Sequence, residues 1–342
     1  MNKKILLIFF INIFIFIGGV SLAFYSKPYD LSIVAIMKNE KPYLKEWIEY
    51  HRLVGVEHFY LCDNDSTDGS KEYLTPYIKK GLITYIAMPG INKQMVCYDK
   101  VVNEYKNKTK WLAIIDLDEF LVPLKAKNMR EFLKEFNDES EVSLHWMIYG
   151  DSHAIRRDEG LVTEFFTSHG RYLNHTVKSI VRPKDVIDFK AVASNHYVKV
   201  RGKSVNENHQ PVSYMLNMNI SGEKARVNHY ILKTYEEFLH KKSRGHPEGI
   251  ALKSGYYFFH NENDIKDNTS MQRFLPALKE RMKKSLLPDV PLPRVENLPE
   301  SFDELYFTAE EASQILNRPI TQPMNFYEVE KVYKNNYPRY TQ

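Results

Sequence analysis

The first third of the chain alternates apolar segments with amphipathic ones, and this alternation limits the possible fold more than any other feature of the sequence. Apolar segments rich in β-branched residues predict strands at residues 31–37, 56–62, 82–87 and 111–115. Helical spacing of apolar residues predicts helices at residues 42–54, 70–80 and 93–105. This order is typical of an α/β fold, in which right-handed crossovers build a mostly parallel sheet with helices on both faces.

Polar clusters follow three of the predicted strands directly. Lys38-Asn39-Glu40 follows the first strand, the segment from Asp63 to Asp68 follows the second, and Asp116-Leu117-Asp118-Glu119 follows the fourth. The carboxyl ends of parallel strands meet at one edge of a sheet, which is where such folds bind their ligands. The sequence therefore predicts a binding site at this edge.

The acidic cluster at the end of the fourth strand is unusual because apolar residues surround it. Residues 111–115 precede it and residues 120–122 follow it. Buried carboxylates are costly unless they are neutralised or bind a metal. On an extended chain Asp116 and Asp118 point to the same side, so they can converge on one hard cation. A strand end with solvated acids is the alternative, and the apolar neighbours argue against it.

The loop from Asp63 to Gly69 allows two interpretations. Asp65 and Asp68 can accept hydrogen bonds from a ribose or a base edge. The same loop can be a capped turn, because Ser66, Thr67 and Asp68 all suit a helix start. Neither a dinucleotide-binding glycine motif nor a P-loop is present in the sequence.

Composition excludes some classes of protein. The net charge is +4, with 47 basic and 43 acidic residues in 342, and no basic stripe with a docking motif predicts nucleic-acid binding. Two cysteines exclude a disulfide framework and a cysteine zinc site. One bridge between Cys62 and Cys97 is possible, but the apolar strand around Cys62 favours a buried thiol.

The N-terminus carries a targeting signal. Lys3 and Lys4 precede twenty uncharged residues, 5–24, and a helix of that length spans roughly 30 Å of hydrocarbon. A signal peptide has a shorter apolar region and a small-residue cleavage site, so we favour an uncleaved anchor. The two lysines favour a cytoplasmic N-terminus, and Lys27 weakens that orientation.

The second half of the chain has a less regular pattern. It predicts a helix at residues 128–136, strands at 141–149 and 226–232, short strand-like pieces between 160 and 230, and a helix at 234–242. From residue 286 onward the chain is rich in proline, which predicts a segment that wraps the surface. Among the scattered histidines, His229 is singled out because an imidazole would complete a metal site that two aspartates begin.

The order of these motifs resembles glycosyltransferase family 92 and is similar to related family-2-like bacterial transferases. The resemblance covers roughly residues 32–245. It is carried by Lys38-Asn39-Glu40, Glu46 to His51, Gly55-Val56, Asp63-Asn64 with Ser66 and Asp68, Trp111, Asp116 to Pro123, Lys178 to Pro183, His196, Asn228-His229-Tyr230, Phe238 and Lys241.

The resemblance implies a Rossmann-like GT-A fold, a nucleotide-sugar donor and a divalent cation. The donor in this family is usually a UDP-hexose, often with galactose, and the cation is Mn²⁺ or Mg²⁺. Transferred by position, Asp116, Asp118 and His229 would hold the metal. The residues around the nucleotide would be Lys38, Asn39, Glu40, Asp65, Asp68 and Asp116.

Inversion at the anomeric carbon, which the family implies, needs a base for the acceptor hydroxyl. Asp151, which follows a strand, and Glu164 are the two candidates.

These inferences together predict a membrane anchor at residues 1–25, a catalytic domain at 26–285 and a proline-rich extension at 286–342. The donor half would be about 31–123 and the acceptor half about 124–245. The predicted function is metal-dependent, inverting transfer of a hexose from a UDP-sugar to a glycan or glycolipid. The protein would be single-pass, in the Golgi if eukaryotic or the inner membrane if bacterial. The alternatives are an anchored carbohydrate-binding protein with an inactive site and a metal-dependent phosphohydrolase.

Overall fold

The computed structural model describes residues 27–188, 196–245, 249, 251–267 and 269–338. The predicted membrane span at residues 5–24 lies outside them. Within the described ranges, every helix is too short or too polar to cross a bilayer.

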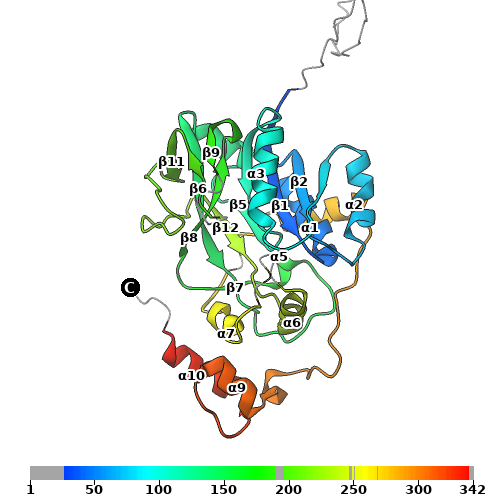
Figure 1. The fold of residues 1–342 in the computed structure, drawn as a ribbon, viewed down its shortest axis with the longest axis vertical. Helices are drawn as coiled ribbons and strands as arrows, with labels where there is room; N and C mark the ends of the chain where they lie inside the picture. Colours follow the sequence, from blue (N-terminus) through cyan, green and yellow to red (C-terminus); the bar gives the residue numbers. More distant parts are fainter. Residues whose placement is uncertain (1–26, 189–195, 246–248, 250, 268, 339–342) are drawn as a thin grey trace, which may run out of the picture.

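A nine-stranded sheet forms the centre of the molecule (Figure 1). Its strands are β1 (Tyr29–Met37), β2 (His58–Asp63), β3 (Ile83–Ala87), β4 (Thr109–Ile114), β5 (Glu119–Pro123), β6 (Glu139–Ile148), β8 (Asn174–Val181), β11 (Lys203–Asn206) and β12 (Ala225–His229). They lie in the order β3-β2-β1-β4-β8-β6-β12-β5, and β11 pairs with β6. Only β5 and β8 run against the other strands. The predicted α/β class with a mostly parallel sheet is confirmed.

Helices cover both faces of the parallel part of this sheet. They are α1 (Lys41–Leu53), α2 (Ser70–Lys79) and α3 (Gln94–Tyr105). Alternate residues of β1 point to opposite faces: Leu31 and Ile33 pack in the core with α1 and α2, whereas Val34 packs in the core with α3. All seven elements predicted for this region are present, with ends shifted by one or two residues.

The remaining elements are shorter. They are α4 (Met129–Phe132), η1 (Leu133–Glu135), α5 (Val162–Phe165), β7 (Ser168–His169), η2 (Pro183–Asp185), β9 (Val186–Asp188), β10 (Lys199–Val200), α6 (Tyr235–Arg244), α7 (Tyr256–His260), β13 (Ile265–Lys266), α8 (Leu275–Lys284), η3 (Phe302–Glu304), β14 (Tyr306–Phe307), α9 (Ala309–Leu316), β15 (Met324–Asn325) and α10 (Phe326–Asn336). The helix predicted at residues 128–136 is present as α4 followed directly by η1.

The proline-rich C-terminal region begins as an irregular segment and ends in two helices. The carbonyl oxygen of Pro288 accepts a hydrogen bond from the Tyr73 hydroxyl, 2.7 Å away, so this segment runs over α2. Further on, α9 and α10 lie at the end of the molecule opposite β9 and β11 (Figure 1). Both helices begin with a capping box, Thr308 with Glu311 and Asn325 with Glu328. These boxes are sequence signals for a helix start, and the proline content of the region does not reveal them.

Cys62 and Cys97 form a disulfide that joins β2 to α3, with an S–S distance of 1.98 Å. The prediction of a buried free thiol at Cys62 is therefore wrong. The helix α3 follows β3 and packs back across the sheet, so it brings Cys97 to Cys62 over 35 residues of sequence.

Replacing both cysteines by serine is expected to lower the free energy of unfolding by about 2–4 kcal/mol, because a loop of this length is no longer closed in the unfolded chain. Urea denaturation with and without reductant measures this change. Reductant should destabilise the wild-type chain and leave the double variant unchanged. Two free thiols in wild-type chain purified without reductant would contradict the bridge.

Glu141 is buried in β6 and accepts hydrogen bonds from the hydroxyls of Ser143, Ser179 and Ser204. Burial raises its pKa to about 7. Between pH 4.5 and about 7 the folded chain keeps a proton on Glu141 that the unfolded chain has lost. The free energy of unfolding therefore falls as the pH rises through this range. Glu141→Gln is expected to raise the free energy of unfolding by about 1–3 kcal/mol near pH 8 and by less near pH 5. Urea titrations at both pH values measure the difference, and an equal effect at both would contradict it.

Candidate functional site

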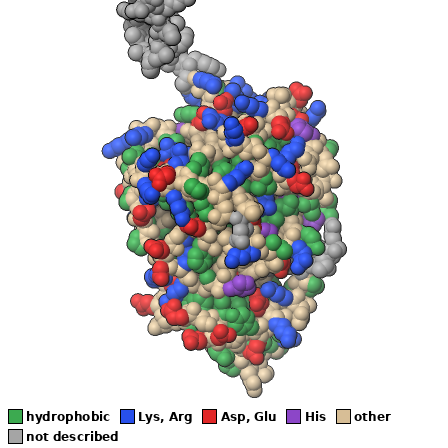
Figure 2. Space-filling model, turned by 180° about the vertical axis from the view of Figure 1, so that it is seen from behind, with side chains coloured by type: hydrophobic (Ala, Val, Ile, Leu, Met, Phe, Trp, Pro, Cys, Tyr) green, Lys and Arg blue, Asp and Glu red, His purple; other side chains and the backbone are tan. Residues whose placement is uncertain are grey.

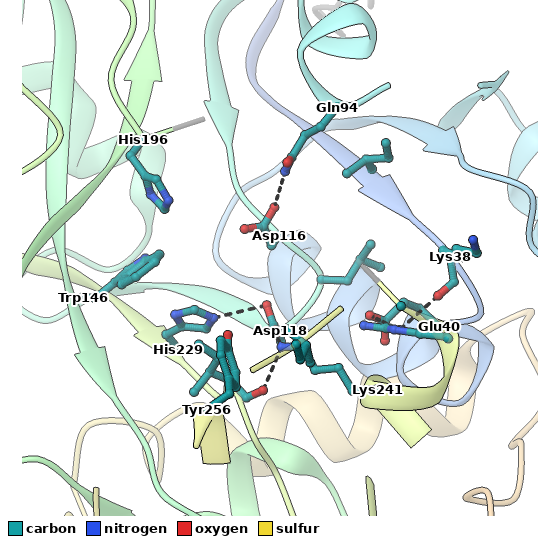
Figure 3. Close-up of a pocket in the computed structure, with 16 residues that line it drawn as sticks. Lys38, Glu40, Gln94, Asp116, Asp118, Trp146, His196, His229, Lys241 and Tyr256 are labelled. Atoms are coloured by element: carbon teal, nitrogen blue, oxygen red, sulfur yellow. Dashed lines mark hydrogen bonds and ion pairs between the residues drawn. The ribbon is translucent and has the colours of Figure 1, made fainter. Parts of the chain in front are cut away.

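One cavity of about 330 Å³ opens where β1, β4 and β12 end (Figure 3). The start of α3, the end of α6 and the start of α7 also contribute to its walls. It is lined by Ile36, Lys38, Glu40, Gln94, Asp116, Leu117, Asp118, Trp146, His196, His229, Ile231, Lys241, Arg244, Gly245, Leu252 and Tyr256. This is the predicted edge of the sheet, and we call this cavity the central pocket.

Asp116 and Asp118 reach the central pocket from a turn between β4 and β5. The N–H of Glu119 donates to the carbonyl of Asp116 over 3.2 Å, which closes the turn. The indole N–H of Trp47 donates to the carbonyl of Glu119, 2.9 Å away, and fixes the turn to α1. The predicted extended conformation is therefore wrong, because the chain reverses here to form the antiparallel strand β5. The turn nevertheless carries both carboxylates into one pocket.

Lys178 neutralises Asp116. Its Nζ lies 2.7 Å from Asp116 Oδ2, and the side-chain amide of Gln94 donates to Oδ1 over 3.2 Å. Burial favours the protonated acid, but the Lys178 ammonium outweighs it and holds the pKa of Asp116 below its ordinary value. Asp116 is therefore ionised and paired.

Lys178 itself is buried, with 1% of its surface exposed, and also lies 3.4 Å from Glu119. Burial raises the pKa of Glu119 well above its ordinary value, although Lys178 opposes the shift. Of the two carboxylates at Lys178, Asp116 is thus shifted toward the charged form and Glu119 toward the protonated form.

Asp118 has two partners in the central pocket. Lys241 Nζ lies 2.7 Å from Oδ2, and His229 Nε2 lies 3.4 Å from Oδ1. The pKa of Asp118 is held well below its ordinary value, since Lys241 and His229 outweigh the effect of burial. Burial lowers the pKa of His229, so its imidazole is neutral near pH 7.

This donor set suits a divalent cation in part. An ionised carboxylate and a neutral imidazole that face each other are ligands that Mn²⁺ accepts. The full set of three ligands is not assembled, however: within the described residues, no three His, Cys, Asp or Glu side chains lie close enough to hold one ion. Asp118 and His229 form the pair, and Asp116 lines the same pocket but is held by Lys178 and Gln94.

Arg244 joins the end of α6 to the residues after β1. Its guanidinium pairs with Glu40 Oε1 at 2.5 Å and donates to the carbonyl of Lys38 at 3.0 Å. The other oxygen of Glu40 is buried and has no hydrogen-bond partner in the described part of the chain. Lys38 and Glu40, two of the residues that the resemblance places around a nucleotide, thus both line the central pocket.

The other predicted nucleotide residues line two neighbouring hollows. Asn39 and Asp68 line one of about 370 Å³, and Asp65 lines one of about 410 Å³. Asp68 accepts hydrogen bonds from the N–H groups of Lys41 and Ser70, each at 3.0 Å, so it holds the starts of α1 and α2. Asp65 accepts from the N–H of Gly90 at 2.7 Å. In the structure this loop is a well-capped turn that borders the site.

The two candidate bases do not line the central pocket. Asp151 is 1% exposed and accepts hydrogen bonds from Tyr257, Asn261 and Asn263, so it ties α7 and its loop to the end of β6. Glu164 is exposed and pairs with Lys279 at 2.5 Å on another part of the surface. Neither carboxylate is therefore in place to take a proton from an acceptor in the central pocket. Asp151 is buried and hydrogen-bonded to three side chains, and Glu164 lies on a different part of the surface.

Several pocket residues were not predicted as site residues. They are the lining residues Gln94, Trp146, His196, Lys241, Arg244 and Tyr256, together with Lys178, which pairs with Asp116 behind the lining. Lys178 carried a usable signal, since a lysine within the apolar segment 177–181 needs a buried counter-charge. The others join the site through long-range packing.

A family model for glycosyltransferase family 92 matches residues 33–241 of the chain, which include the acidic turn, Lys178, His229 and Lys241. The chain belongs to glycosyltransferase family 92. A family 92 protein of Ricinus communis is 25% identical over 222 residues, 61% of this chain and 36% of that protein. One of Oryza sativa subsp. japonica is 24% identical over 222 residues, 64% of this chain and 36% of that protein. The family 92 chain thus spans about a third of the length of these relatives.

Among solved structures, the family 92 chain is similar to S. aureus TarS residues 1–349, with 13% identity, a TM-score of 0.32 and coverage of 45% of this chain and 47% of that one. Core-mannan synthase A from Aspergillus fumigatus, solved in an Mn/GDP form, matches with 10% identity, a TM-score of 0.24 and coverage of 39% and 46%.

Proposed function

We propose that this family 92 chain is a GT-A glycosyltransferase that moves a hexose from a UDP-sugar to a glycan acceptor with inversion. The observation that carries the proposal is the central pocket, where an ionised aspartate and a neutral imidazole face each other among several basic side chains at the carboxyl edge of the sheet. Attachment to a membrane through residues 5–24 is part of the proposal.

Asp118 and His229 would hold the divalent cation, Mn²⁺ or Mg²⁺, with Asp116 beside them. A bound cation would neutralise the oxygens of the donor diphosphate. Lys241 and Arg244 border the same pocket and supply positive charge where the leaving diphosphate gains negative charge, so they would stabilise the transition state more than the ground state.

Glu40 would recognise a hydroxyl group of the donor. Its Oε2 is a buried acceptor without a partner among the described residues, while Oε1 is held by Arg244. A buried acceptor of this kind costs free energy until a ligand donates to it.

Glu40→Gln is therefore expected to raise the KM for the donor about tenfold with little change in kcat, because a hydrogen bond to a charged acceptor is replaced by a weaker one. Initial rates over a range of donor concentrations measure both constants. Glu310→Gln, an exposed change on α9, is the control and should match the wild type. A fall in kcat at unchanged KM would contradict this role.

The proposed function is tested with the full chain in detergent, a panel of UDP- and GDP-hexoses, simple glycoside acceptors and Mn²⁺. The expected result is release of nucleoside diphosphate from one UDP-hexose with a matching glycosylated product. A folded chain that turns over none of the donors, yet binds a glycan, would instead support the binding-protein alternative. Release of free phosphate would support the phosphohydrolase.

A further inference from the structure

The end of the sheet opposite the central pocket forms a second surface. The strands β1, β2, β3, β4, β6, β11 and β12 all start at this end, and the antiparallel strands β5 and β8 finish there. Backbone hydrogen bonds join its loops: the N–H of Tyr29 donates to Lys108 over 2.9 Å, and the N–H of Leu124 donates to Lys224 over 2.7 Å. Because these strands are neighbours in one sheet, their ends and the loops between them form one face.

Exposed basic side chains dominate this face, which we call the basic end. They are Lys27, Lys79, Lys80, Lys106, Lys108, Lys110, Lys125, Lys127, Arg130, Lys134, Lys184, Lys199, Arg201 and Lys203. The exposed carboxylates of the same segments are fewer: Glu104, Glu131, Glu135, Asp138 and Glu223. The chain as a whole has a net charge of only +4, so its positive charge is concentrated here. Figure 2 shows Lys and Arg side chains, with fewer Asp and Glu side chains among them, at the end of the molecule where the described chain begins.

Many of the acids near this face are already paired with its own basic residues. Asp30 pairs with Lys110 at 2.6 Å, and Glu57 pairs with Arg130 at 2.7 Å. In contrast, no ion pair within the described residues involves Lys106, Lys108, Lys125, Lys127 or Lys184. The face thus presents lysines whose charge the fold leaves uncompensated.

The position of β1 in the fold indicates which kind of surface the basic end contacts. The predicted span ends at Phe24 and β1 begins at Tyr29, at the basic end. Five residues reach at most about 18 Å even when fully extended. If residues 5–24 cross a bilayer, the basic end is therefore held against its surface, where lysines gain energy from anionic lipids within a Debye length.

We propose that the basic end docks on the anionic headgroups of the membrane. This inference rests on the charge of the face and on the predicted span, and it does not require the transferase activity. With the basic end docked in this way, the central pocket lies at the other end of the strands. The pocket then opens away from the bilayer, toward an acceptor in the aqueous phase.

The experiment uses the full chain in nanodiscs of phosphatidylcholine alone or with phosphatidylglycerol. Brief acetylation of lysines followed by mass spectrometry gives a labelling rate for each side chain. Lys80, Lys106, Lys125 and Lys184 are expected to react about fivefold more slowly in anionic discs. High salt should abolish the difference. Lys331 and Lys334 on α10 are the internal controls and should react equally in both lipids.

A variant with Lys106, Lys108, Lys125 and Lys127 all changed to Glu should lose the protection of Lys80 and Lys184. The matched variant Lys331→Glu with Lys334→Glu should keep it. Equal labelling in both lipids overturns the proposal, as does failure of the chain to enter either disc. The transferase assay in detergent is independent of these outcomes, so failure of one proposal is distinguishable from failure of the other.

Discussion

The Asp118→Asn chain is expected to lose donor binding and transfer, with kcat/KM falling at least about 10²–10³-fold. The change removes the carboxylate charge of Asp118, whose Oδ1 lies 3.4 Å from His229 Nε2, and leaves the side-chain shape intact. Loss of a group that stabilises charge in the transition state costs this much in other enzymes, and loss of a metal ligand adds to it. Steady-state rates with saturating Mn²⁺ measure the effect.

This substitution also leaves Lys241 without its buried counter-ion, so its effect on stability is controlled separately. A single uncompensated charge of this kind costs about 3–5 kcal/mol. The double variant Asp118→Asn with Lys241→Met removes the pair together and should recover most of the stability. It should still fail to bind donor. Recovery of transfer in the double variant would show that Asp118 serves only to neutralise Lys241.

Lys178→Met is expected to lower the free energy of unfolding by about 3–5 kcal/mol near pH 8, because Asp116 and Glu119 lose the one cation that lies between them. Without Lys178, burial raises the pKa of both carboxyls in the folded state above the unfolded values. The folded variant then binds more protons than the unfolded chain, so its stability falls as the pH rises. Urea denaturation from about pH 5 to pH 8 measures this slope.

The matched variant adds Glu119→Gln and Asp116→Asn to Lys178→Met, which leaves no buried charge in the cluster. It should regain stability near pH 8 and lose the pH slope. A Lys178→Met chain with wild-type stability at both pH values would contradict the buried ion pair.

The parallel half of the fold was predictable because its signals are local. Each strand and helix of residues 29–114 carries its own periodicity and its own end signals, and the order of elements then limits the topology. The turn at Asp116 and Asp118 was not predictable in this way. Its direction depends on β5 pairing with β12, a strand more than a hundred residues further on.

The same distinction applies to the site. The edge of the sheet and the acidic turn could be located from strand ends, and the chemistry of imidazole singled out His229. Gln94 and Arg244 could not be located, because Gln94 stands at the start of α3 and Arg244 at the end of α6, and only the packing of these helices on the sheet brings both to the pocket. The surroundings of Asp151 could not be predicted either, because a carboxylate after a strand looks the same in the sequence whether it faces a ligand or, as here, Tyr257 and two asparagines.

The measurement that tests the central claim most directly is a calorimetric titration of UDP into the full-length chain, with Mn²⁺ and again with a chelator in its place. The account predicts binding in Mn²⁺ that weakens at least about tenfold in the chelator and is absent in Asp118→Asn at either condition. Equal affinity with and without the metal, or unchanged affinity in Asp118→Asn, would contradict the assignment of Asp118 and His229 to a cation and of the central pocket to the donor.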